Sequence, residues 1–305
     1  MKCHYILFKR IEPWNISLLL LSLVFSSSLE AQKKSYLLMV GLEDIDYAAY
    51  QKKGKHYDPA ATIGVVNDLT NMKFVLGTNY SISITLKDKL ASRKSILDTL
   101  RYIGRNVKAG DFFLFYFTGH GDTIKDRSLD ELQGYDQELI AYDQPIVDDE
   151  LYRIFMQYFK ETENVMIVDA CHSGSMYKIA RPFIDYGPGK MAVASFEMKS
   201  TNKMMRSGSC SLNMQQYLDE PFSLLYLGAA PNDQPALGQL SGGVLTRGIY
   251  LINLRAKQSN RWQQYTYPKF TCELKDLIRK SGQDIQYLEI GQVSTVTSNK
   301  IPFTH

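Results

Sequence analysis

Cysteine is scarce in this sequence. The chain has four cysteines in 305 residues, and the three beyond residue 31 are Cys171, Cys210 and Cys272. Three cysteines cannot all pair, so at least one thiol stays free, which excludes a small disulfide-stapled scaffold. Cys210 and Cys272 could form a bridge or remain buried as thiols. We favour two unpaired structural thiols, because free cysteine is among the most buried residue types.

An excess of charge of one sign is also absent. The chain has 35 basic and 32 acidic residues and a formal net charge of +3. We therefore expect no nucleic-acid partner and no polybasic membrane-binding tract. The GPGK segment at residues 187–190 lacks the early glycine and the following hydroxyl of a phosphate-binding loop. No spaced set of cysteine and histidine residues predicts a zinc site.

The first 31 residues have the pattern of a secretory signal peptide. Three basic residues precede the apolar run Ile16–Phe25, and a cleavage site is expected after Ala31. The apolar run is too short to span a bilayer comfortably as a permanent helix. We therefore expect an exported protein, periplasmic or secreted, with no stable membrane insertion of the mature chain. An uncleaved membrane anchor is the alternative.

The rest of the chain alternates between strand and helix patterns. Strands are expected at residues 35–40, 81–86, 111–118, 164–169, 222–227 and 284–290, and helices at 62–76, 92–107, 148–158, 243–256 and 271–280. This alternation predicts an α/β fold, with a mostly parallel central sheet flanked by helices on both faces. Residues 41–58 and 121–144 are predicted to be irregular. Residues 176–220 are predicted to form a long mobile connection within a single domain of residues 32–305.

Two of the expected strands end in glycine beside a reactive side chain. FFLFYFTGHG at residues 112–121 contains His120, and VMIVDACHSGS at residues 165–175 contains Cys171. The chain between them is long enough for a helical crossover, which would make the two strands parallel. Their C-terminal ends would then lie at one edge of the sheet, where open parallel sheets bind ligands. We therefore expect both side chains in one site.

Cysteine and histidine together indicate acyl transfer to water. A cysteine is nucleophilic as its thiolate, and His120 is placed to serve as the base that Cys171 needs near neutral pH. The backbone N–H groups of Gly121 and Cys171 are candidates for an oxyanion hole. No third catalytic residue is obvious, and a backbone carbonyl could orient the imidazole. His172 is predicted to be structural, because adjacent residues of an extended chain point to opposite faces.

The TGHG and DACHSG segments resemble the His and Cys motifs of the caspase-like clan of cysteine peptidases, most closely its metacaspase and bacterial orthocaspase branch. Asp169 and His172 replace the residues of the animal caspase signature, a departure toward the metacaspase pattern. Other segments look like family segments in family order: VVNDLTNMKFVL, ELQGYDQELIAYD, DDEL, LYLGAAPNDQPA and GGVLTRGI. The resemblance covers nearly the whole mature chain. It implies a caspase-like (caspase–hemoglobinase) fold and an endopeptidase with a Cys171–His120 dyad and a thioester intermediate.

The resemblance also implies a substrate preference. The family's pocket for the residue before the scissile bond corresponds to Asp68, Asp169 and Thr118, the last at a position where serine is usual. Two carboxylates should attract Arg or Lys and reject Asp through like-charge repulsion. Peptides and proteins cleaved after Arg or Lys are therefore the expected substrates. The alternatives are that Asp68 is a surface charge of its helix and that Asp169 merely ends its strand.

Calcium is a candidate ligand, and no cofactor is required. Asp136, Asp148 and Asp149 match positions through which metacaspases often bind calcium. The alternative is that Asp148 and Asp149 bind no metal and are simply acidic residues at the start of a helix. Metacaspases have a further calcium ligand just after the Cys motif. In this sequence that region is Met176–Lys178, which contains no carboxylate.

The connection at residues 176–220 falls where caspases carry a cleavable linker between subunits. Its basic residues make it a candidate substrate for self-processing, with Lys199, Lys203 and Arg206 as candidate sites. An ordinary solvated loop is the alternative.

Two other functions remain open. The chain could be a catalytically inactive caspase-like module that binds peptides or scaffolds a partner. It could also be another cysteine hydrolase of the clan, such as a transpeptidase or an asparaginyl-type enzyme, although an acidic pocket disfavours a neutral substrate side chain.

Overall fold

The computed structural model describes residues 32–125, 135–171, 200–207, 210–217, 222–230, 236–291 and 300–303, without the side chains of 200–207, 210–217 and 238–239. Contacts divide the chain into two units, Met1–Lys33 and Lys34–His305, and every described helix and strand belongs to the second. The expected signal peptide and its cleavage site lie outside the described residues. Within the described ranges, no helix has the length and apolar character needed to cross a membrane.

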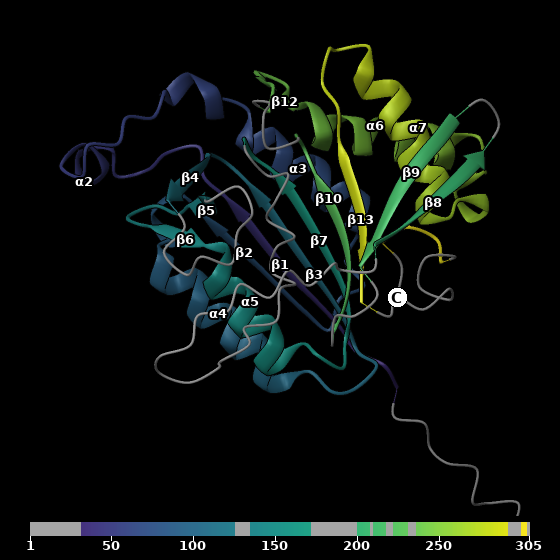
Figure 1. Cartoon of the computed structure of the whole chain (residues 1–305), viewed down its shortest axis with the longest axis horizontal. Coiled ribbons are helices and arrows are strands. Elements are labelled where there is room, and N and C mark those ends of the chain that lie inside the picture. The colour runs from purple at the N-terminus through teal and green to yellow at the C-terminus, as the bar shows by residue number, and fades with distance from the viewer. Residues whose placement is uncertain are drawn as a thin grey trace, which may run out of the picture. The chain divides into compact units, whose positions relative to one another are not determined.

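The centre of the second unit is an eight-stranded sheet in the order β2–β1–β3–β7–β10–β13–β9–β8 (Figure 1). Its strands are β1 (Ser35–Gly41), β2 (Ile82–Lys87), β3 (Phe112–Thr118), β7 (Glu163–Asp169), β8 (Ser200–Ser207), β9 (Cys210–Tyr217), β10 (Ser223–Gly228) and β13 (Gln286–Ile290). Neighbouring strands from β2 to β10 are parallel, and so are β13 and β9. The pairs β10–β13 and β8–β9 are antiparallel. The predicted α/β class with a mostly parallel sheet is confirmed.

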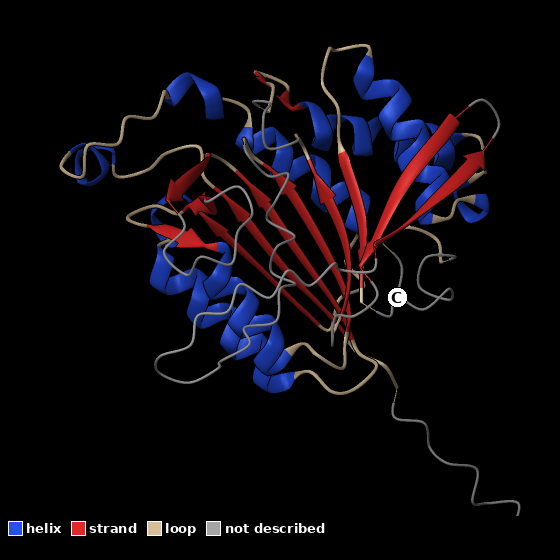
Figure 2. Cartoon of the chain, in the orientation of Figure 1, coloured by secondary structure: helices blue, strands red, loops and turns tan. Residues whose placement is uncertain are grey.

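Helices cover both faces of this sheet (Figure 2). Side chains of β3 alternate between two cores: Phe113, Phe115 and Phe117 pack with α4 (Arg93–Asn106) and α5 (Asp148–Tyr158). Leu114 and Tyr116 pack on the opposite face with α3 (Val65–Leu76), α6 (Val244–Gln258) and α7 (Tyr267–Arg279). A strand buried on both faces must be apolar at successive positions, which explains the unbroken apolar run before His120.

Two stretches predicted to be irregular contain regular structure. Residues 121–144 contribute β4 (Gly121–Lys125) and β5 (Tyr135–Ile140), which join β6 (Pro145–Val147) in a three-stranded antiparallel sheet. Residues 41–58 contain the short helix α2 (Tyr47–Gln51), and the 3₁₀ helix η1 (Pro59–Thr62) follows. Strand β5 was not predicted because Asp136, Gln137 and Glu138 are all buried, so it shows no alternation of polar and apolar residues.

The predicted mobile connection at residues 176–220 is wrong for its second half, which forms the β8–β9 hairpin at the end of the sheet. Strand β8 is largely polar in sequence, and backbone pairing rather than an apolar run defines it. Lys203 and Arg206, two of the candidate self-cleavage sites, lie within β8. A protease needs an extended, accessible segment, so cleavage there would require the hairpin to open. Lys199 and residues 176–198 lie outside the described part.

Candidate active site

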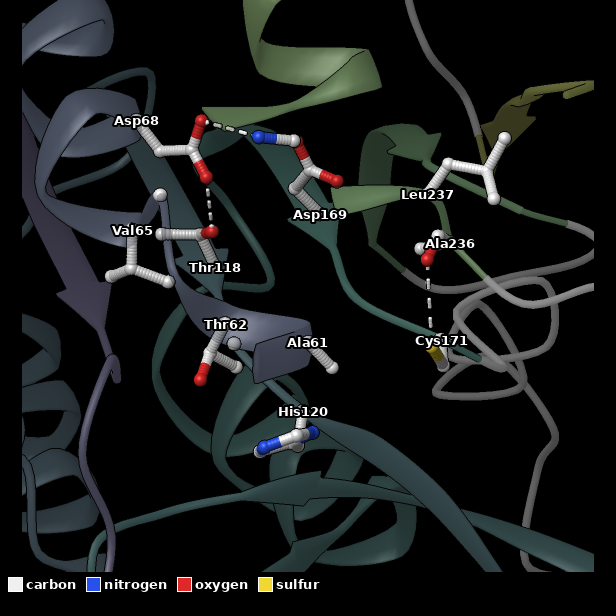
Figure 3. Close-up of a pocket in the computed structure, with 13 residues that line it drawn as sticks. Ala61, Thr62, Val65, Asp68, Thr118, His120, Asp169, Cys171, Ala236 and Leu237 are labelled. Carbon is white, nitrogen blue, oxygen red and sulfur yellow. Dashed lines mark hydrogen bonds between the residues drawn. The ribbon is translucent and has the colours of Figure 1, made fainter. Parts of the chain in front are cut away.

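The two strands that end near glycine are direct neighbours. Strands β3 and β7 pair in parallel, with Thr118 opposite Asp169. Their C-terminal ends therefore reach the same edge of the sheet, as expected. His120 and Cys171 line one pocket at this edge, together with Asp68 and Asp169 (Figure 3).

His120 is a buried residue fixed through its backbone. Only 7% of the residue is exposed, and its carbonyl accepts a hydrogen bond from the Ile140 N–H of β5 at 3.1 Å. Its side-chain Nε2 is buried and has no hydrogen-bond partner among the described residues. Burial lowers the pKa of His120, while the carboxylates of Asp58 and Asp122 act in the opposite direction. The imidazole is therefore neutral near pH 7 and has a nitrogen that can accept a proton.

Cys171 is a free thiol. Its Sγ donates to the carbonyl of Ala236, with sulfur and oxygen 3.8 Å apart. Burial raises the pKa of the thiol, and the nearby Asp169 carboxylate adds to the rise. The thiol is therefore protonated in this arrangement and needs a base to become a nucleophile.

Gly121 lies against the backbone of Cys171. A Cβ atom at this position would overlap the carbonyl oxygen of Cys171, so a glycine is required for the turn after His120 to approach the end of β7. This contact brings the backbones of Gly121 and Cys171 together. Whether their N–H groups form an oxyanion hole stays a prediction, and His172 lies outside the described residues.

An acidic pocket, formed by Asp68, Thr118 and Asp169, lies beside the cysteine and histidine. Asp68 comes from α3 and is 2% exposed, and Asp169 ends β7 and is 5% exposed. Asp68 is therefore not a surface charge of its helix. Its Oδ2 accepts a hydrogen bond from the Thr118 hydroxyl at 2.8 Å, and its Oδ1 accepts one from the Gly243 N–H at 2.8 Å (Figure 3).

The second carboxylate of the acidic pocket is held by helix α6. The backbone N–H and the hydroxyl of Thr246 both donate to Asp169 Oδ2, at 2.9 and 2.7 Å. The Thr246 hydroxyl is also within 2.7 Å of the Tyr116 hydroxyl. Thr246 lies in the first turn of α6, where unpaired N–H groups and the helix dipole favour a negative charge.

The two carboxylates do not both ionise readily. Burial raises the pKa of Asp68 to about 8, and repulsion from Asp169 contributes to this rise. Burial also raises the pKa of Asp169, opposed by the two hydrogen bonds from Thr246. Since the hydrogen-bond donors to the pair among the described residues are all neutral, the pocket favours a cation or a retained proton.

Sequence reasoning gave no role to the glycines that complete this pocket. The antiparallel segments β11 (Gly238–Gln239) and β12 (Gly242–Gly243) lead into α6. A Cβ on Gly242 would overlap the Asp68 carboxylate, and one on Gly243 would overlap that of Asp169. The signal that could have identified them is the Gly-Gly pair before a helix that has a hydroxyl residue in its first turn.

Asp136, Asp148 and Asp149 form no metal-binding group among the described residues, and calcium binding stays a prediction. Asp148 is buried, and its two carboxylate oxygens accept hydrogen bonds from the N–H groups of Gln137 and Asp149. Burial raises its pKa to about 8, and the charges of Asp136 and Asp149 add to the rise. Asp149 forms an ion pair with Arg153 at 3.2 Å. The described chain contains no group of three or more His, Cys, Asp or Glu residues placed to hold a metal ion. Residues 176–178 lie outside it.

One cysteine prediction is wrong. Cys272, buried on α7, is disulfide-bonded, whereas we favoured an unpaired thiol. Cys210 begins β9, but its side chain lies outside the described residues. The expectation that at least one thiol stays free is met by Cys171. Sequence could not decide the pairing, because spacing along the chain does not report the distance between side chains.

Residues 45–180 match the family model of the metacaspase peptidase C14 domain. The matched segment contains both His120 and Cys171 and is similar to the metacaspase peptidase domain. Metacaspase-1 of Plasmodium falciparum (isolate 3D7) is 33% identical over 134 residues, which are 38% of this chain and 22% of that protein. Metacaspase-1A of Aspergillus terreus is 31% identical over 127 residues, 37% of this chain and 32% of that protein. This chain thus spans about a fifth to a third of the length of these relatives.

Solved structures extend the likeness in fold beyond the matched segment. Protein GSU0716 from Geobacter sulfurreducens superimposes with a TM-score of 0.61 at 20% identity and covers 89% of this chain and 98% of its own. Caspase-1 from Spodoptera frugiperda has a TM-score of 0.49 at 10% identity, and the superposition covers 85% of this chain and 89% of that chain. The first likeness shows a fold shared over most of the chain. Together with the matched segment, it supports an α/β fold of the caspase-like type for this chain.

Proposed function

We propose that this chain is a cysteine endopeptidase that hydrolyses peptide bonds after Arg or Lys. The observation that carries the proposal is one pocket lined by His120, Cys171 and two buried carboxylates, Asp68 and Asp169. A nucleophile, a neutral base and an anionic cavity are the parts that acyl transfer at a basic residue requires. The family match supports the same reaction class.

The proposed reaction uses His120 first as a base and then as an acid. The Cys171 thiol leaves the Ala236 carbonyl and turns to the imidazole, which accepts its proton. Sulfur bonds to the scissile carbonyl carbon, and the carbonyl oxygen takes the electron pair, with the N–H groups of Gly121 and Cys171 as candidate donors. The imidazolium returns the proton to the leaving amine, and a thioester remains. Water, deprotonated by His120, then releases the carboxylic acid and restores the thiol.

The acidic pocket supports the preference for Arg or Lys. Bringing a guanidinium or ammonium group between Asp68 and Asp169 would replace like-charge repulsion with attraction in a buried setting. An aspartate side chain would instead add a third negative charge. The neutral donors around the pair, from Thr118, Gly243 and Thr246, would keep the two carboxylates oriented.

The test is the hydrolysis of fluorogenic peptides that differ only in the residue before the scissile bond, with Arg, Lys, Asp and Asn compared. We expect turnover of the Arg and Lys peptides and its loss in Cys171→Ala. Lys94→Ala, an exposed change on α4, is the matched control and should retain full activity. Turnover of the Asp peptide alone, or equal turnover in Cys171→Ala, would contradict the proposal. Turnover of the Asn peptide alone would support an asparaginyl-type enzyme.

A second candidate function is an inactive module that binds basic peptides. It is favoured by one observation: the Cys171 thiol hydrogen-bonds to Ala236, and no hydrogen bond joins it to His120 among the described residues. A thiol-reactive probe distinguishes the two. Labelling of Cys171 at neutral pH no faster than that of a simple thiol, with peptide binding intact, would support the inactive module.

Export and self-processing belong to the same proposal. The disulfide of Cys272 supports an oxidising compartment, periplasmic or extracellular, since cytosolic disulfides are rare. Of the candidate self-cleavage sites, we retain Lys199. The intact masses of the active chain and of Cys171→Ala test both points. Loss of residues 1–31 from both forms would report export. A cut after Lys199 in the active form alone would report self-processing.

A further inference from the structure

We propose that Tyr57 is a positioning residue for the His120 imidazole: its ring packs against the imidazole, and its hydroxyl is fixed by Asp122. The inference rests on the proposed cysteine peptidase function. It supplies the group that orients the imidazole, which no motif in the sequence revealed. Tyr57 lies in the segment between α2 and η1, far from His120 in the sequence.

The contact between the two rings is direct. The ring centroids of Tyr57 and His120 lie 5.2 Å apart, with an angle of 34° between the ring planes. Within the described part of the chain, no side-chain hydrogen bond to the imidazole is found, and its Nε2 is buried without a partner. Packing must therefore fix the ring's orientation, and Tyr57 supplies an aromatic face for this.

Tyr57 is itself held at both its hydroxyl and its ring. The hydroxyl donates to Asp122 Oδ2 at 2.8 Å. The ring packs edge-on against Tyr50, with centroids 5.2 Å apart, and the Tyr50 hydroxyl donates to the Ala141 carbonyl at 2.8 Å. Asp122 is only two residues after His120, on β4. The anchor of Tyr57 is therefore part of the segment that contains the imidazole.

Lys55 keeps the anchoring carboxylate ionised. Its Nζ lies 2.9 Å from Asp122 Oδ2 and also forms an ion pair with Glu138, which sits opposite Asp122 on β5. Burial acts to raise the pKa of Asp122, but hydrogen bonds from Lys55, Tyr57 and the Thr123 N–H outweigh it, and the pKa is lowered. A negative charge thus remains behind the Tyr57 hydroxyl, where it stabilises an imidazolium on His120.

Three variants test the positioning role. Tyr57→Phe keeps the ring and loses the bond to Asp122, whereas Tyr57→Leu loses the ring. Tyr102→Leu, at a tyrosine 50% exposed on α4, is the matched control. With an Arg peptide we expect kcat to fall about fivefold in Tyr57→Phe, the effect of one hydrogen bond, and about 100-fold in Tyr57→Leu, the effect of a misplaced base. KM should change by less than about twofold, because Tyr57 does not line the acidic pocket.

The pH dependence separates positioning from charge. The carboxylates that act on His120 are those of Asp58 and Asp122, and both raise its pKa against the effect of burial. Removing either charge should move the acid limb of kcat/KM to lower pH. Asp58→Asn should do only this, since Asp58 does not contact the Tyr57 hydroxyl. Asp122→Asn should also lower kcat.

Alkylation of Cys171 by iodoacetamide gives a readout that needs no substrate. In Tyr57→Leu we expect slow alkylation at neutral pH, where the thiol depends on His120, and a normal rate at alkaline pH, where it ionises unaided. Wild-type kcat and alkylation in Tyr57→Leu would overturn the inference. Equal loss of alkylation at both pH values would overturn it too, because it would mark a collapsed site. If no peptide is cleaved by the wild-type chain, the proposed function fails, while the alkylation profile still decides the role of Tyr57.

Discussion

At the scale of single residues, the acidic pocket contains two carboxylates that have no positively charged partner among the described residues. Asp68 and Asp169 are buried, repel one another and receive hydrogen bonds only from uncharged donors among the described residues. A buried pair of this kind lowers its free energy by keeping a proton or by accepting a cation. Substrate binding should therefore be linked to proton release.

The first prediction concerns this linkage. Asp68, with a pKa of about 8, is protonated below that pH and ionised above it. The affinity for an Arg peptide should therefore rise as pH rises through about 8, measured as Kd by fluorescence anisotropy on Cys171→Ala. The same peptide with citrulline in place of Arg is the control and should show no such trend. A flat pH profile for the Arg peptide would contradict the linkage.

The second prediction removes one charge from the acidic pocket. Asp169→Asn keeps an oxygen that can accept the Thr246 hydrogen bonds but lacks the charge. Losing one partner of a buried ion pair should lower kcat/KM for Arg peptides by about 100-fold. Asp98→Asn, on the exposed surface of α4, should leave it unchanged. An unaltered preference for Arg in Asp169→Asn would show that Asp169 only ends its strand.

At the scale of elements, the N-terminus of α6 and the β11–β12 turn organise the acidic pocket. Gly243 is the N-cap of α6, and its N–H reaches Asp68 on α3, while Thr246 reaches Asp169 on β7. The start of α6 thus connects α3 and β7, the two elements that carry the carboxylates of the acidic pocket. Orphan N–H groups of a first turn need acceptors, and the carboxylates supply them.

The third prediction concerns this connection. Thr246→Val has nearly the same shape but loses the hydroxyl between Asp169 and Tyr116. We expect a loss of about 1–3 kcal/mol in the free energy of unfolding, since buried polar atoms lose their partner, and a higher KM for Arg peptides. Thr70→Val, an exposed threonine on α3, is the control. Urea unfolding and peptide kinetics measure the two effects, and unchanged values would refute the role of Thr246.

The elements also show where sequence patterns succeed. The helix at α5 begins at Asp148 and ends at Tyr158 as predicted, and Ser92 accepts a hydrogen bond from the Ser95 N–H as the cap of α4. Local signals determine such ends. The β8–β9 hairpin and the β4–β6 sheet were missed, because their strands are rich in polar residues and are defined by backbone pairing, not by an apolar pattern.

At the scale of the whole molecule, the described fold combines a sheet buried on both faces with a disulfide at α7. The two cores on opposite faces of the sheet are rich in aromatic residues, and Phe113 stacks on Phe159 with centroids 4.3 Å apart. Cys272 lies in the core on the other face and contributes a covalent link to it.

The fourth prediction concerns this link. In a Cys171→Ala background, Cys272→Ser should lower the free energy of unfolding by about 2–4 kcal/mol, because the disulfide restricts the unfolded chain. Dithiothreitol should lower the thermal midpoint of the Cys171→Ala protein and leave that of the double variant unchanged. Thermal unfolding with and without the reductant measures this. Equal midpoints in all four conditions would show that the bond adds no stability.

The sequence by itself predicted that His120 and Cys171 lie together at the ends of two neighbouring strands. Apolar runs that end in glycine predicted β3 and β7, and parallel pairing then requires His120 and Cys171 to lie at one edge of the sheet. These conclusions depend on local periodicity and on general rules of topology. They needed no knowledge of side-chain contacts.

Only the tertiary structure decided what surrounds that pair. Gly243 donates to Asp68 across 175 positions of the chain, and Tyr57 meets His120 from another segment. It also showed that Cys272 is disulfide-bonded. Such contacts depend on how helices pack on the sheet, to within a fraction of an ångström. No local pattern of residues encodes that distance.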